Sequence, residues 1–197
     1  MTLAFATACV PASSRPSLGA EPALDAQRPD PRVAEFLAEL DTTGAETFTA
    51  TYTIRRPASA TNYEVLVSQR DGEAVVKTGD RSVPGGLRPA VCRLTVKTCL
   101  ADVVDGDLGD IGWDFFAAGA AQRIEAAQRR ATGPALVTTG TMAGVGVSCL
   151  TLPTPEAGSA MFCRTAEGIL ASATDGDLQI DLAGFVRRVD PDTFTIS

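Results

Sequence analysis

The sequence predicts an α+β domain built on an antiparallel sheet. Three observations support this prediction: a strictly alternating strand near residue 50, an amphipathic helical segment near residue 120, and a second group of short strands after it. In both groups strand follows strand, with no helix between them. This order is typical of antiparallel meanders, whereas a parallel sheet needs helical crossovers.

A short helix opens the domain, and the clearest strand follows it. Apolar residues recur at helical spacing from Val33 to Leu40, and the region of Gly44 ends the pattern. In residues 47–54, four apolar residues alternate with four threonines. This alternation predicts a strand with one apolar face and one hydroxylated face. The apolar residues are Phe48, Ala50, Tyr52 and Ile54.

The first meander continues with strands at 62–68 and 73–78, joined by a turn at Asp71-Gly72. Residues 113–130 are predicted to form one helix, because apolar residues fall on a single stripe of it. That stripe consists of Trp113, Phe116, Ala120, Ile124 and Ala127. The second meander is expected at 143–152, 159–165, 169–173 and 178–182, with a last extended piece around Phe194.

The sequence around Cys9 predicts a membrane anchor. It ends a short apolar run through the small residues Ala6, Thr7 and Ala8, as in the tail of a bacterial lipoprotein signal, where the cysteine becomes the lipidated first residue. Only eight residues precede Cys9, and none is basic, which a start codon assigned too late would explain. The alternative is a meaningless apolar stretch with an unpaired cysteine.

The other four cysteines predict two disulfides and an oxidising compartment. Cys92 and Cys99 lie seven residues apart, and Cys149 and Cys163 bracket a segment rich in proline. Both are hairpin layouts, so the pairs Cys92–Cys99 and Cys149–Cys163 are favoured among three connectivities. A zinc site is the alternative, but the chain has no Cys-x-x-Cys spacing and no histidine. The folded part is therefore expected outside the cytoplasm.

Composition divides the chain into three parts. Residues 1–9 are the remnant of the lipoprotein signal, and residues 10–31 are a linker rich in Pro, Ser and Ala. Residues 32–197 form one domain, which is large enough for a sizeable core or for a core with a cavity.

Composition and motifs argue against several classes of function. The net charge of −7, with no basic cluster, argues against nucleic-acid binding, and arginine pairs such as Arg187-Arg188 are expected to be solvated surface. Without histidine, Ser-His-Asp and Cys-His catalysis are impossible, although carboxylate-only chemistry stays open. The acidic turn at Asp105, Asp107 and Asp110 does not fit a calcium loop. We expect no enzyme activity, no metal and no cofactor.

A series of short motifs resembles the LolA-like and LppX/LprG-like lipoprotein superfamily, in particular a group of actinobacterial lipoproteins. The resemblance covers residues 32–197 and depends on the order of its motifs. They are Thr47-Phe48-Thr49-Ala50-Thr51-Tyr52, the Cys92 and Cys99 pair with the helix after it, Met142-Ala143-Gly144, Ser148-Cys149-Leu150, Met161-Phe162-Cys163-Arg164-Thr165, Glu167-Gly168-Ile169-Leu170 and Val189-Asp190-Pro191-Asp192-Thr193-Phe194.

The resemblance implies a strongly curved antiparallel sheet, a half-barrel, whose concave face is covered by helices and encloses a lipid cavity. It implies a protein that binds or carries a lipid or acylated molecule. Together with the anchor at Cys9, we expect a monomer that is lipid-anchored on the extracytoplasmic face of the cell membrane. The alternative is an envelope sensor or protein-interaction module with a filled core and an envelope protein partner. The cavity candidates are Phe48, Tyr52, Ile54, Phe115, Phe116 and Ile124, with Gly106, Gly109 and Gly112 leading into a lid.

Overall fold

Eleven antiparallel strands form one open sheet in the computed structural model, which therefore has the expected α+β class. The structure describes residues 30–40, 45–56, 58, 60–85, 90–101, 111–155, 158–176 and 178–194. Cys9, nearly all of the predicted linker, Gly44, the acidic turn, Gly106 and Gly109 lie outside these residues.

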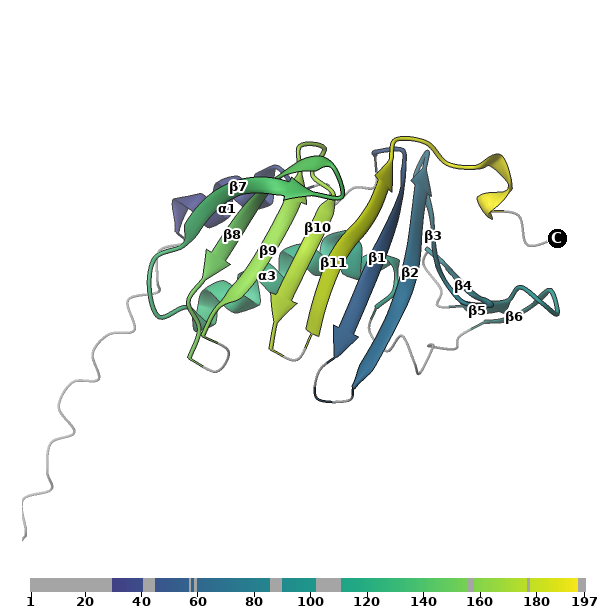
Figure 1. The fold of residues 1–197 in the computed structure, drawn as a ribbon, viewed down its shortest axis with the longest axis horizontal. Helices are drawn as coiled ribbons and strands as arrows, with labels where there is room; N and C mark the ends of the chain where they lie inside the picture. The colour runs from purple at the N-terminus through teal and green to yellow at the C-terminus, as the bar shows by residue number, and fades with distance from the viewer. Residues whose placement is uncertain are drawn as a thin grey trace, which may run out of the picture.

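The strands follow the sheet order β6-β5-β4-β3-β2-β1-β11-β10-β9-β8-β7 (Figure 1). Their bounds are β1 Phe48–Arg56, β2 Thr61–Arg70, β3 Glu73–Thr78, β4 Arg81–Pro84, β5 Ala90–Arg93, β6 Thr98–Ala101, β7 Leu136–Met142, β8 Val145–Leu152, β9 Ala160–Thr165, β10 Leu170–Asp175 and β11 Leu178–Val186. The two predicted meanders are confirmed, and they are joined where β1 pairs with β11, with Tyr52 opposite Leu182.

The alternation of β1 is confirmed in the burial of its side chains. Phe48, Ala50, Tyr52 and Ile54 are buried, whereas the threonines between them are half-buried. Because the alternating side chains of a strand point to opposite faces, one face of β1 contributes to the apolar core. The predicted turn at Asp71-Gly72 is also present, with positive φ at both residues.

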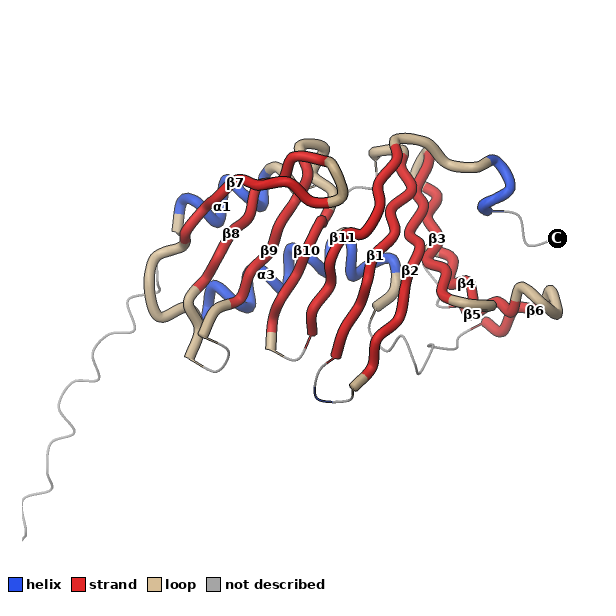
Figure 2. Tube along the Cα trace, in the orientation of Figure 1, coloured by secondary structure: helices blue, strands red, loops and turns tan. Residues whose placement is uncertain are grey.

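Helices α1 (Pro31–Ala38) and α3 (Ala118–Arg130) lie on the same side of the sheet, and α3 runs across several strands (Figures 1 and 2). Asp30 caps α1, since its Oδ1 accepts a hydrogen bond of 2.9 Å from the Arg32 N–H. Val33 and Phe36 are buried against the core.

The helical segment predicted over 113–130 is present with these bounds, but it is not one continuous helix. The segment forms a short helix α2 (Trp113–Phe116) and the longer α3, with a break at Ala117, where φ is −118° and ψ is −112°. Gly119 lies in the first turn of α3, just after the break. A Cβ at this position would lie 2.6 Å from the Asp114 carbonyl oxygen. The backbone of α3 therefore approaches α2 too closely for any other residue at this position. The predicted apolar stripe is retained, with Phe116, Ala120, Ile124 and Ala127 buried and Trp113 partly buried.

The second meander begins earlier than predicted. Residues 136–142 form the edge strand β7, and Ala143 and Gly144 make the turn into β8 with positive φ values of 49° and 78°. The prediction of a strand from residue 143 is therefore wrong at its start. β7 was missed because its side chains are nearly all exposed, so no buried face produces an alternation.

The prediction of a last extended piece around Phe194 is also wrong. Pro191–Phe194 form a 3-10 helix, η2. Asp190 starts it, because its carbonyl accepts from the Thr193 N–H at 2.9 Å and its Oδ1 accepts from the Asp192 N–H at 3.0 Å. Pro191 suits the first helical position, where no N–H is needed.

Both favoured cysteine pairs are disulfides in the structure. Cys92 lies opposite Cys99 across β5 and β6, and Cys149 lies opposite Cys163 across β8 and β9. Each bond therefore links neighbouring strands of one hairpin. Cys149 and Cys163 are buried, whereas Cys99 is exposed.

Candidate binding sites

The six cavity candidates lie together in one apolar cluster. Phe48, Tyr52 and Ile54 come from β1, Phe115 and Phe116 from α2, and Ile124 from α3. All six side chains are buried. The sequence thus identified residues that the tertiary structure brings together, although they are separated by up to about 75 positions in the chain.

Aromatic rings from α2 pack directly against β1. The ring centroids of Tyr52 and Phe116 are 4.7 Å apart, and those of Phe115 and Phe116 are 5.2 Å apart in an edge-to-face arrangement. Such spacings are close contacts between aromatic rings. At this place in the structure, the space expected for an acyl chain contains side chains of the protein itself.

The hydroxyl of Tyr52 already has a protein partner. It donates a buried hydrogen bond of 2.7 Å to the Leu170 carbonyl at the start of β10. Burial raises the pKa of Tyr52 well above its usual value, because the phenolate would be desolvated. Tyr52 therefore links β1 to β10 and remains a neutral donor.

A separate pocket of about 260 Å³ lies where β11 ends and the β9–β10 turn begins. Its walls combine apolar and charged residues. They are Ala45, Glu46, Thr47, Phe48, Glu167, Ile169, Phe185 and Arg187. Small-molecule sites usually measure about 300–1,000 Å³, so this pocket lies just below the lower end of that range.

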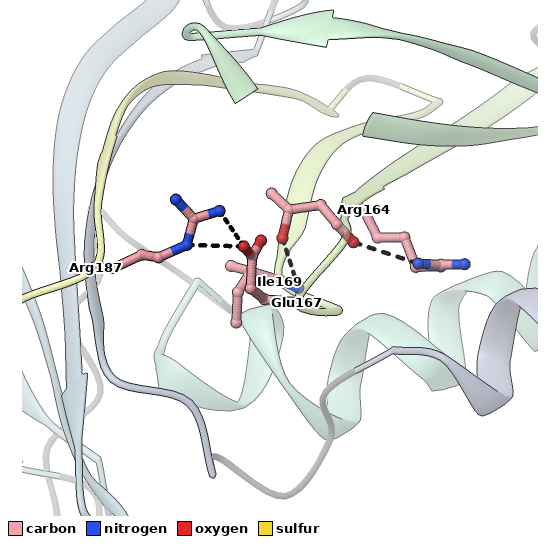
Figure 3. Close-up of polar contacts among 5 residues, drawn as sticks. Arg164, Glu167, Ile169 and Arg187 are labelled. Carbon is pink, nitrogen blue, oxygen red and sulfur yellow. Dashed lines mark hydrogen bonds and ion pairs between the residues drawn. The ribbon is translucent and has the colours of Figure 1, made fainter. Parts of the chain in front are cut away.

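Glu167 and Arg187 form an ion pair beside this pocket (Figure 3). Arg187 Nε donates to Glu167 Oε1 at 2.8 Å. The turn that presents Glu167 is tightly bonded, because the Ile169 N–H donates to the Thr165 hydroxyl at 3.3 Å and the Thr165 N–H donates to the Ile169 carbonyl at 2.8 Å. Gly168 has φ +82°, a left-handed backbone conformation that glycine adopts without steric cost.

Opposing effects set the pKa of Glu167. Burial acts to raise it, but hydrogen bonds from Arg187, from Thr165 and from its own backbone N–H, together with the Arg187 charge, outweigh burial and hold the pKa below its usual value. The carboxylate is therefore charged and neutralised by Arg187 at neutral pH. Because the Glu167 carboxyl has already lost its proton at neutral pH, it is a poor general acid. The group suits a structural or recognition role.

Sequence reasoning missed the pairing of these two groups. Arg187 is exposed, as expected of solvated surface, yet it contacts Glu167 at the open end of the β10–β11 hairpin. The Glu167-Gly168 turn was recognisable as a motif, but no local signal relates it to a residue twenty positions later. Pairing across β10 and β11 creates the contact.

Arg164 is a second residue that the sequence did not single out as functional. It is nearly buried in β9, where its guanidinium lies 5.3 Å from the centroid of the Phe36 ring and pairs with Glu39. Burial lowers the pKa of Arg164, while the nearby charge of Glu35 acts to raise it. These contacts attach α1 to the sheet, so we assign Arg164 a structural role.

A shallow pocket of about 420 Å³ follows the junction of α2 and α3, between Asp114 and Arg129. The Arg123 guanidinium covers the Phe115 ring at 4.6 Å from its centroid, which shields this ring from solvent. Gly112, the described glycine of the predicted lid, precedes α2 and makes no side-chain cap.

In the part of the chain that the structure describes, no helix is long and apolar enough to cross a membrane. Among the same residues, no group of three or more potential ligands is placed to hold a metal ion.

No protein-family model and no curated protein matches the chain. Among solved structures, the chain is similar to MucB, with a TM-score of 0.46 and 11% identity over 84% of this chain and 62% of the MucB chain. It is also similar to MucB in complex with MucA(peri), with a TM-score of 0.45 and 12% identity over 79% and 56% of the two chains. The chain spans less than two thirds of each MucB chain, and likeness at this level transfers no function.

Proposed function

We propose that the chain is a non-catalytic protein of the cell envelope that binds another protein, with its apolar core filled by its own side chains. In this proposal Cys9 carries the lipid anchor and holds the domain on the extracytoplasmic face of the membrane. The two disulfides support an oxidising compartment.

The contact between Phe116 and Tyr52 carries this proposal. In the half-barrel expected from the LolA-like resemblance, helices on the concave face would leave a cavity over the sheet. Here the Phe116 ring occupies the space above Tyr52, and the neighbouring Phe48, Ile54 and Ile124 are buried in the same cluster. A close-packed interior leaves the protein surface as the place for recognition.

Native mass spectrometry with lipid extraction tests the filled core. The chain would be secreted from a related host with its disulfides intact, and measured before and after incubation with an envelope lipid extract. We expect the mass of the chain without bound lipid in both samples, apart from the anchor on Cys9. A stoichiometric, extractable lipid on a Cys9→Ser variant would contradict the proposal.

Lipid carriage is the second candidate, and the break at Ala117 favours it. Because α2 is a separate short helix, its two phenylalanines could leave the sheet together, and acyl chains such as palmitate could replace them. Each buried methylene would contribute about 0.8 kcal/mol. The Phe116→Asp variant discriminates: if it folds and binds lipid as well as the original chain does, α2 has no role as a lid.

A further inference from the structure

The strand β7 leaves one edge of the sheet open. It is the last strand in the sheet order and pairs with β8 on one side, while no strand lies on its other side among the residues that the structure describes (Figures 1 and 2). Residues 136–141 are all exposed, including Leu136 at 60% and Val137 at 41%. Neither face of this strand is covered.

The open edge lacks the usual protection against pairing. Natural edge strands carry charges, prolines or bulges that prevent the addition of another strand. Here no charged residue occurs anywhere from 131 to 155, although 21% of the chain is charged. The opposite edge strand β6 is different, because it has only four residues and directly follows Lys97.

The two ends of β7 limit the pairing to seven residues. At the start, both backbone groups of Ala135 are already used: its N–H donates to Asp30 Oδ2 at 2.9 Å, and its carbonyl accepts from Arg32 Nη1 at 2.7 Å. At the other end, Ala143 and Gly144 turn the chain into β8. A partner strand therefore has one register that uses the whole edge.

We propose that the β7 edge binds a second copy of this chain, with the two β7 strands antiparallel about Thr139. In this register Leu136 faces Met142 and Val137 faces Thr141 of the other copy. Thr138 faces Gly140, and Thr139 faces itself. Pairs of apolar, β-branched and hydroxyl side chains stabilise antiparallel strands, and no like charges meet. The contact is isologous and closes as a dimer.

The uncharged, self-complementary sequence of β7 supports a second copy as the occupant. Each chain has a net charge of −7, so two copies repel each other over most of their surfaces. The uncharged β7–β8 hairpin is a place where two acidic copies approach without like charges at the contact. This inference goes beyond the proposed function and does not depend on it, and it replaces the monomer expected from the sequence.

Sedimentation velocity of the full chain with both disulfides formed tests the dimer. We expect the sedimentation coefficient to rise with protein concentration from that of one chain to that of two. Thr139→Lys places two charges against each other at the twofold axis and should weaken the dimer at least tenfold. The matched control Leu100→Lys places the same charge on the opposite edge, at another exposed residue, and should leave the dimer unchanged.

Charge reversal gives a second, independent readout. Thr139→Lys alone and Thr139→Glu alone should be monomeric, while an equimolar mixture should form a heterodimer, because residue 139 meets its own counterpart. Near-native melting temperatures would show that both variants fold. A chain that is monomeric at every concentration, a dimer insensitive to Thr139→Lys, or a mixture that stays monomeric would each overturn the proposal. None of these results would affect the lipid test of the proposed function.

Discussion

Phe116 covers Tyr52, with ring centroids 4.7 Å apart, and thereby joins the helical layer to the strand β1 at the middle of the sheet. Tyr52 in turn donates to the Leu170 carbonyl. The residues predicted to line a cavity are thus among the central packing contacts of the protein. This relationship determines which substitutions should be costly.

Phe116→Ala should destabilise the protein by about 3–5 kcal/mol, because it removes a buried ring and leaves a cavity over Tyr52. Chemical denaturation monitored by circular dichroism measures this loss. The control Val186→Ala lies at an exposed position and should change the free energy of unfolding by less than about 0.5 kcal/mol. A Phe116→Ala variant as stable as the original chain would contradict the packing described here.

Tyr52→Phe should cost about 1 kcal/mol, since it removes the buried hydrogen bond to Leu170 and leaves that carbonyl without this donor. The ring itself is retained, so its packing against Phe116 should persist. Equilibrium unfolding of the two proteins gives the difference. An unchanged stability would show that the hydroxyl contributes no net stabilisation.

The two disulfides should be reduced in a fixed order. Cys99 is exposed, whereas Cys149 and Cys163 are both buried, and a reducing thiolate must reach a sulfur atom to attack it. Timed alkylation followed by mass spectrometry should therefore detect free Cys92 and Cys99 first. Replacing Cys149 and Cys163 by serine should cost about 3 kcal/mol by the loop-entropy estimate. Simultaneous reduction of both bonds in the native state would contradict this order.

Asp30→Ala should loosen both α1 and the start of β7. The carboxylate caps α1 through the Arg32 N–H and also accepts from the Ala135 N–H, and these bonds lower its pKa. Loss of a helix cap costs about 0.5–2 kcal/mol. Hydrogen exchange should accelerate at Arg32 and at Ala135 together. Asp30→Asn keeps only one acceptor oxygen, so it should restore the protection at Arg32 or at Ala135 but not at both.

Glu167 should make the protein less stable in acid. Its pKa in the folded protein lies below the usual value of 4.5, so its contribution is complete above that value and is lost as the pH falls through the folded pKa. Glu167→Gln should therefore reduce the loss of stability between about pH 7 and about pH 3. The exposed variant Glu73→Gln is the control. Identical pH profiles for the original chain and Glu167→Gln would contradict a stabilising ion pair with Arg187.

Local patterns predicted most strands because each of these strands buries at least one face. The alternation at 47–54 and the turn at Asp71-Gly72 are short-range signals, and both appear in the structure. The edge strand β7 has no buried face, so its sequence carries no such periodicity. The break at Ala117 was equally hidden, because it depends on the approach of Gly119 to Asp114 and leaves the apolar stripe intact.

The sequence by itself determined the α+β class, the two meanders, the favoured cysteine pairs and the six apolar residues that meet in the core. These follow from periodicity and spacing, which act over a few residues. Only the tertiary structure decided that Phe116 fills the space over Tyr52, that Glu167 reaches Arg187, and that β7 is left uncovered. Each of these depends on how distant segments pack, and side-chain volume and strand order become fixed only when the whole chain is folded.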